Sequence, residues 1–68
     1  MNKLLKAAKD KYLAQKSEAL AHLEILFNQS VGIGEHTDIL SEVSKWVDSL
    51  SQAEENLKTL NENFGEEK

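Results

Sequence analysis

Apolar residues recur at alternating intervals of four and three residues through the second half of the chain. The eight positions are Ile39, Val43, Trp46, Leu50, Ala53, Leu57, Leu60 and Phe64. A helix with this spacing gathers its apolar side chains into one narrow stripe, which becomes buried when the helix packs lengthwise against another helix. The pattern therefore predicts a helix over about residues 37–64 with a helical partner. Thr37 is its predicted N-cap, and Gly65 is the residue at which it should stop.

The first half of the chain carries a broader apolar pattern, which predicts another long helix over about residues 3–28. One side of this helix collects Leu5, Ala8, Tyr12, Ala19, Leu23 and Leu26. Leu13, Leu20 and Phe27 form a neighbouring row at seven-residue intervals, so the apolar side is wider than a two-row seam. Polar residues at 15–17 interrupt the pattern near the middle.

The segment between the two helices, residues 29–36, breaks the helical period. Gly32 and Gly34 allow the chain to turn, and one of them is expected to cap the first helix. Two helices of similar length joined by a short loop form an antiparallel αα-hairpin. The sequence therefore predicts an all-α, coiled-coil-like hairpin in which residues 1–68 make a single domain.

The two halves of the chain also suggest a register. Placing Leu20 opposite Trp46 and Phe27 opposite Ile39 near the loop lets large and small side chains alternate toward the termini. Charge supports the same pairing. Lysines cluster near the N-terminus at positions 3, 6, 9, 11 and 16, and glutamates cluster near the C-terminus at 54, 55, 62, 66 and 67. A hairpin brings these clusters side by side, which favours this orientation of the helices.

Composition narrows the classes of protein that fit. The chain has 68 residues, a net charge of −4, no cysteine and no arginine. Disulfides and thiolate metal sites are excluded, and the negative charge makes nucleic-acid binding unlikely. No apolar run is long enough for a membrane span, so we expect a cytoplasmic protein. A core this small usually needs a further source of stability, such as disulfides, a metal or oligomerisation. Without cysteines, oligomerisation is the source that we expect.

Several apolar residues fall outside the seam and gather toward the loop end of the hairpin. They are Ile25, Val31, Ile33, Leu40 and Val47, together with part of Trp46, which is too large for two helices to cover. A contiguous exposed apolar patch usually marks a protein interface. We expect it to join two hairpins into a homodimeric four-helix assembly. The alternatives are that the loop covers these residues within the monomer, or that a different protein binds them.

Residues capable of catalysis or metal binding do not form a recognisable pattern. His36 lies near Glu35 and Asp38, but the spacing of a metal site is missing, and His22 is expected to form a surface ion pair with Glu18. The serines have no histidine and aspartate at suggestive spacing, and the glycines lack the phosphate-loop pattern. We therefore expect no enzyme activity, no cofactor and no metal.

The run from Val31 to Ile39, with sequence VGIGEHTDI, resembles a segment of small uncharacterised αα-hairpin proteins of T4-like bacteriophages. These proteins also have a Leu/Ala-rich helix before the run and a heptad helix after it, although proline is expected there in place of Thr37. The resemblance implies a phage early protein that acts on a host or phage protein in the cytoplasm of the infected cell. It supplies no catalytic residues.

These observations predict a small protein–protein interaction module without catalytic activity. Two alternative functions stay open. One alternative is a nucleic-acid-binding accessory protein that uses the Lys-rich first helix. The other is a purely structural assembly piece.

Overall fold

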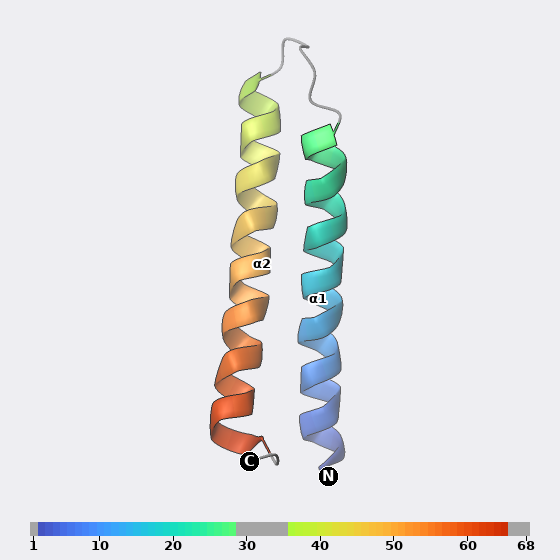
Figure 1. The fold of residues 1–68 in the computed structure, drawn as a ribbon, viewed down its shortest axis with the longest axis vertical. Coiled ribbons are helices and arrows are strands. Elements are labelled where there is room, and N and C mark those ends of the chain that lie inside the picture. Colours follow the sequence, from blue (N-terminus) through green and yellow to red (C-terminus); the bar gives the residue numbers. More distant parts are fainter. Residues whose placement is uncertain (1, 29–35, 66–68) are drawn as a thin grey trace.

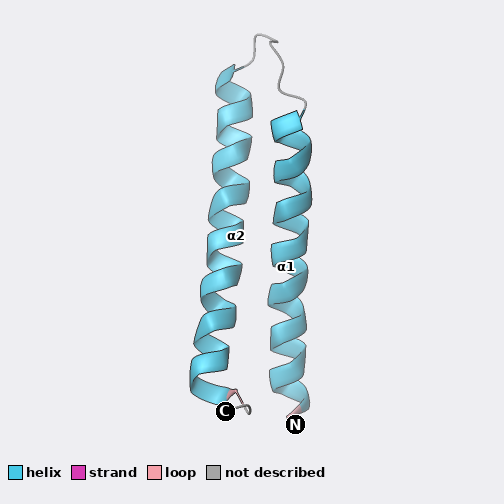
Figure 2. Cartoon of the chain, in the orientation of Figure 1, coloured by secondary structure: helices cyan, strands magenta, loops and turns pink. Residues whose placement is uncertain are grey.

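The computed structural model describes residues 2–28 and 36–65, and nearly all of them are helical. The first helix, α1, spans Lys3–Asn28, and the second, α2, spans His36–Phe64. The helices lie antiparallel and side by side, so the start of α1 and the end of α2 meet at one end of a rod (Figure 1). Only Asn2 and Gly65 are described outside the helices (Figure 2). The predicted all-α helical hairpin is confirmed, with extents of 50 × 17 × 14 Å.

The N-terminus of α1 is capped by a residue that the apolar pattern does not predict. The side-chain oxygen Oδ1 of Asn2 accepts hydrogen bonds from the backbone N–H groups of Leu4 at 2.7 Å and Leu5 at 3.1 Å. The first N–H groups of a helix have no partner within the helix, and such a cap contributes about 0.5–2 kcal/mol. The predicted start of α1 is therefore fixed by Asn2.

The ends of α2 differ in how well they were predicted. The helix begins at His36, so the predicted N-cap Thr37 already lies within it. The side chain of Thr37 is outside the described part of the chain. Asp38 lies in the first turn, where the helix dipole favours a negative charge. At the other end, the N–H of Gly65 donates to the carbonyl oxygen of Asn61 at 3.1 Å. A Cβ atom on Gly65 would lie 2.5 Å from that oxygen, which explains why α2 stops at a glycine.

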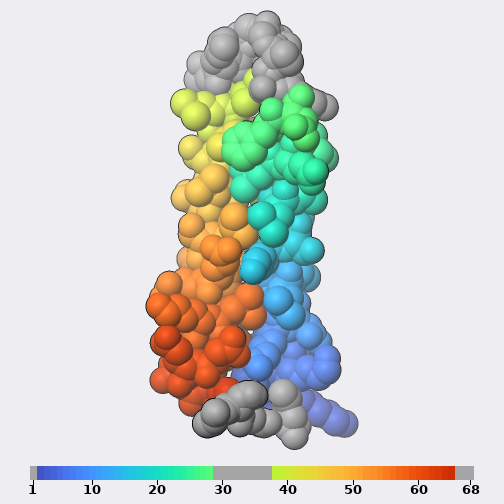
Figure 3. All heavy atoms as spheres, in the orientation of Figure 1, coloured from blue at the N-terminus to red at the C-terminus, as the bar shows by residue number. Residues whose placement is uncertain are grey.

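The core between the helices is thin. Among the described residues only Ala19, Leu23 and Ala53 are buried. Half-buried residues extend this core along both helices at the positions that the seam predicts: Leu5, Ala8, Tyr12 and Leu26 on α1, and Ile39, Val43, Trp46, Leu50, Leu57 and Leu60 on α2. Phe64 is the exception, because 61% of it is exposed at the end of the rod. Figure 3 shows the two helices packed against each other along their length.

The connection between the helices, residues 29–35, lies outside the described residues. The prediction that Gly32 or Gly34 caps α1 falls in this segment, and the alternative that the loop covers the off-seam apolar residues depends on it.

Candidate protein interface

Eight large apolar side chains are exposed among the residues that the structure describes, and five of them fall in two rows along the rod. These five are Leu13 (51% exposed), Leu20 (47%) and Phe27 (62%) on α1, and Leu40 (65%) and Val47 (42%) on α2. On each helix these residues repeat every seven positions, so each set forms a row of side chains that rise by about 10 Å from one to the next. Contacts between the helices show on which side of the hairpin each row lies.

One such contact is a polar bridge in the middle of the seam. The side-chain amide of Gln15 donates from Nε2 to the carbonyl oxygen of Ser49 at 3.0 Å, and it also lies 3.4 Å from the Ser49 hydroxyl. The bridge explains the polar interruption in the apolar pattern of α1. Residues two apart on a helix point in directions about 160° apart. Leu13 precedes Gln15 by two residues and Val47 precedes Ser49 by two, so both project on the side of the hairpin opposite this bridge.

A ring stack gives the same result closer to the loop. The rings of His22 and Trp46 lie parallel, with their centroids 3.9 Å apart and an angle of 3° between their planes. Leu20 precedes His22 by two residues, so it also projects on the opposite side of α1. The row on α1 and the row on α2 therefore share one side of the hairpin. We call this side, formed by Leu13, Leu20, Phe27, Leu40 and Val47, the apolar face.

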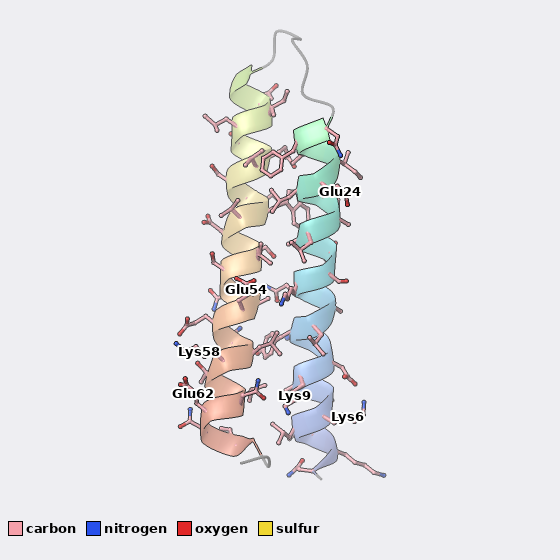
Figure 4. All side chains as sticks on the ribbon, viewed as in Figure 1. Lys6, Lys9, Glu24, Glu54, Lys58 and Glu62 are labelled. Carbon is pink, nitrogen blue, oxygen red and sulfur yellow. The ribbon has the colours of Figure 1, made fainter. Side chains whose placement is uncertain are left out.

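Charged side chains border the apolar face toward the termini. Glu54 follows Val47 by seven residues and continues the row on α2, while Lys9 and Lys16 flank the seam on α1. Both lysines are half-buried, which is typical of side chains that lay their methylene groups along an apolar surface. Figure 4 labels Glu54 over α2 and Lys9 on the side of α1 toward α2. By contrast, it shows Glu24 on α1 and Lys58 on α2 at the outer sides of the rod. The apolar face thus has an apolar half near the loop and a charged half near the termini.

The structure places the residues predicted for the interface in different parts of the hairpin. Leu40 and Val47 are exposed on the apolar face. Ile25 is 54% exposed but follows His22 by three residues, which places it on the side of α1 that carries the ring stack. Trp46 is half-buried and covered on one ring face by His22, so it belongs to the hairpin and not to the apolar face. Val31 and Ile33 lie outside the described residues.

The predicted interface does not include the exposed row on α1, which is formed by Leu13, Leu20 and Phe27. The predicted register used Leu20 and Phe27 to cover Trp46 and Ile39, but both remain largely exposed, and the ring opposite Trp46 belongs to His22. The seven-residue spacing of Leu13, Leu20 and Phe27 was the available signal. A row that lies beside the seam on one helix stays uncovered when only one other helix packs against that seam.

Charge pairing between the helices is looser than the sequence suggests. The ion pair found among residues 2–28 and 36–65 lies within α1, between the Lys6 ammonium and the Asp10 carboxylate at 2.9 Å. Both side chains are mostly exposed, so the pair contributes little to stability. The expected ion pair between His22 and Glu18 is replaced by the stack on Trp46. Among the described members of the lysine and glutamate clusters, no ion pair joins the two helices.

The fluorescence of Trp46 reports on the ring stack, because Trp46 is the only tryptophan of the chain. We expect His22→Ala to expose the indole, shift its fluorescence emission to longer wavelength and lower the free energy of unfolding by about 0.5–1.5 kcal/mol. Fluorescence spectra and urea denaturation measure both effects. Glu24→Ala, at the outer side of α1, is the matched control and should change neither. An unchanged emission spectrum in His22→Ala would contradict the stack.

Comparison with known proteins found no matching family model, no matching curated protein and no matching solved structure. The resemblance to phage hairpin proteins therefore stays a prediction. Within the described residues, no group of three or more histidine, aspartate and glutamate side chains is placed to hold a metal ion. Neither α1 nor α2 is long and apolar enough to cross a lipid bilayer.

Proposed function

We propose that this chain is a helical protein–protein interaction module that binds through its apolar face and acts without catalysis. The observation that carries the proposal is the exposure of five large apolar side chains on one side of a hairpin whose core is thin. A small protein rarely leaves such a contiguous patch in water unless another surface covers it. The resemblance to phage hairpin proteins makes a phage or host protein in the bacterial cytoplasm one class of partner.

The distribution of charge favours a protein partner over nucleic acid. The net charge is −4, Lys6 is paired with Asp10, and Lys9 and Lys16 are half-buried along the seam. A nucleic-acid-binding helix normally presents its cations as one exposed stripe toward the phosphates. The lysines of α1 are spread around the helix, so this alternative has no supporting geometry.

Photo-crosslinking tests which side of the hairpin meets another protein. A photoreactive phenylalanine analogue placed at position 20 of the full chain in living bacterial cells should yield protein adducts, because Leu20 lies at the centre of the apolar face. The same analogue at position 25 is the matched control, since Ile25 is similarly exposed on the other side of α1.

The pattern of adducts shows whether the apolar face is the binding surface, independently of which protein binds there. Adducts from position 20 but not from position 25 support binding through the apolar face, whatever the size of the partner. Equal adducts from both positions, or none from position 20, would overturn the proposal.

A further inference from the structure

We infer that the occupant of the apolar face is a second copy of this chain, and that the two hairpins pack with their two-fold axis parallel to the helices. This inference rests on the proposed function and names the partner for it. The product is a four-helix bundle in which α1 of each copy lies against α2 of the other copy, with both loops at the same end.

The surface area of the chain matches what such a dimer needs. The accessible surface is 5103 Å² for a mass of 7.6 kDa. A compact folded monomer of this mass exposes about 4,300 Å², so the hairpin exposes roughly 800 Å² more than expected. A standard protein interface buries about 800 Å² on each partner. One face-to-face contact of standard size between two copies would therefore remove an area equal to this excess from each copy.

The two rows of the apolar face complement each other under this symmetry. Leu20 lies between Gln15 and His22 along α1, and Val47 lies between their partners Trp46 and Ser49 along α2, so both side chains are at about the same height on the rod. A two-fold axis parallel to the helices preserves height and exchanges the helices. It therefore brings Leu20 of one copy against Val47 of the other, and Phe27 against Leu40 near the loops.

The charged half of the face selects this axis over the perpendicular one. Glu54 lies at the height between Lys9 and Lys16, because seven residues separate it from Val47 in the direction of the termini. With the parallel axis, the Glu54 carboxylate of one copy faces α1 of the other copy at the height of Leu13, where Lys9 and Lys16 lie four residues before and three residues after and can neutralise it. With a perpendicular axis through Leu20 and Val47, the same carboxylate would face Leu40 of the second copy. An unpaired carboxylate in an apolar contact is costly, so the parallel axis is favoured.

Introduced cysteines test both the partner and the axis, because the chain has none of its own. We expect wild-type protein to sediment at about twice 7.6 kDa at micromolar concentrations. Mixed and mildly oxidised, Leu20→Cys and Val47→Cys should form a disulfide between the two variants, while each variant alone should not crosslink, since a disulfide needs Cα atoms within about 7 Å. Ile25→Cys, on the other side of α1, is the control that should not crosslink with either variant.

A charged residue introduced at the centre of the apolar face tests whether this face contributes to the free energy of self-association. Leu20→Asp should weaken self-association by about 100-fold, whereas Ile25→Asp should leave it unchanged. Circular dichroism records whether each variant keeps its helices, and the cysteine experiment does not depend on that result.

Each failure has a separate meaning. A helical wild-type monomer at all concentrations would overturn the inference, and adducts to a larger protein from position 20 would then leave the proposed function intact. A disulfide in Leu20→Cys alone would overturn the parallel axis. Absence of adducts from position 20 would overturn the proposed function itself.

Discussion

Replacing Leu23 with alanine should lower the free energy of unfolding by about 2–4 kcal/mol, because the change leaves a cavity in the core. Leu23 is 6% exposed, and the other buried residues of the described chain, Ala19 and Ala53, are too small to compensate. A core of this size supplies only about 3–5 kcal/mol in total. We therefore expect Leu23→Ala to retain only about 1 kcal/mol, so that a measurable fraction of its molecules is unfolded at ambient temperature. Urea denaturation followed by circular dichroism at a fixed chain concentration measures this loss.

The matched control for this experiment is Ile25→Ala, two residues along the same helix. Ile25 is 54% exposed and lies off the apolar face, so its truncation should change stability by less than about 0.5 kcal/mol. Equal losses in the two variants would show that Leu23 is not the anchor of the core.

Enlarging Ala53 to leucine should have the second-largest effect. Ala53 is 0% exposed, and three extra carbon atoms there have no space between the helices. Overpacking of this kind costs about 1–3 kcal/mol, and each kcal/mol lowers the melting temperature of a domain this size by about 4–8 °C. Thermal unfolding followed by circular dichroism measures the change.

Ala14→Leu is the control for the enlarged side chain, because Ala14 is exposed on α1. It should melt at about the wild-type temperature, since the helix propensity of leucine is only slightly below that of alanine. If Ala53→Leu also melted unchanged, the helices would have to be farther apart than the burial of Ala53 requires.

The helices themselves could be predicted from the sequence because their signals are local. Apolar side chains that repeat every three and four residues give a continuous stripe only on a helix, and the predicted range of α1 agrees with Lys3–Asn28. Glycine at position 65 ended α2 where expected, for a reason visible in the backbone at Asn61. The Asn2 cap was missed, since the apolar pattern contains no information on side-chain hydrogen bonds to the first turn.

The exposed apolar face was predicted only in part. Leu40 and Val47 follow from the pattern of α2 alone, because they lie directly beside a regular seam. Trp46 was assigned to the interface because its size exceeds what a seam of aliphatic side chains covers. The missing partner was His22, whose flat ring covers the indole from the other helix. No periodicity in α1 distinguishes such a histidine from one in water.

The sequence by itself determined that this protein is two long helices, where each begins and ends within a residue or so, and most of the residues of each helix that face the other. It also contained the exposed row Leu13, Leu20 and Phe27, as a seven-residue repeat. Only the tertiary structure decided that this row and the pair Leu40 and Val47 lie on the same side of the hairpin. The physical reason is that each helix can rotate about its own axis until specific contacts stop it. Here the Gln15–Ser49 bridge and the His22–Trp46 stack set that rotation, and together they turn two separate apolar rows into one face.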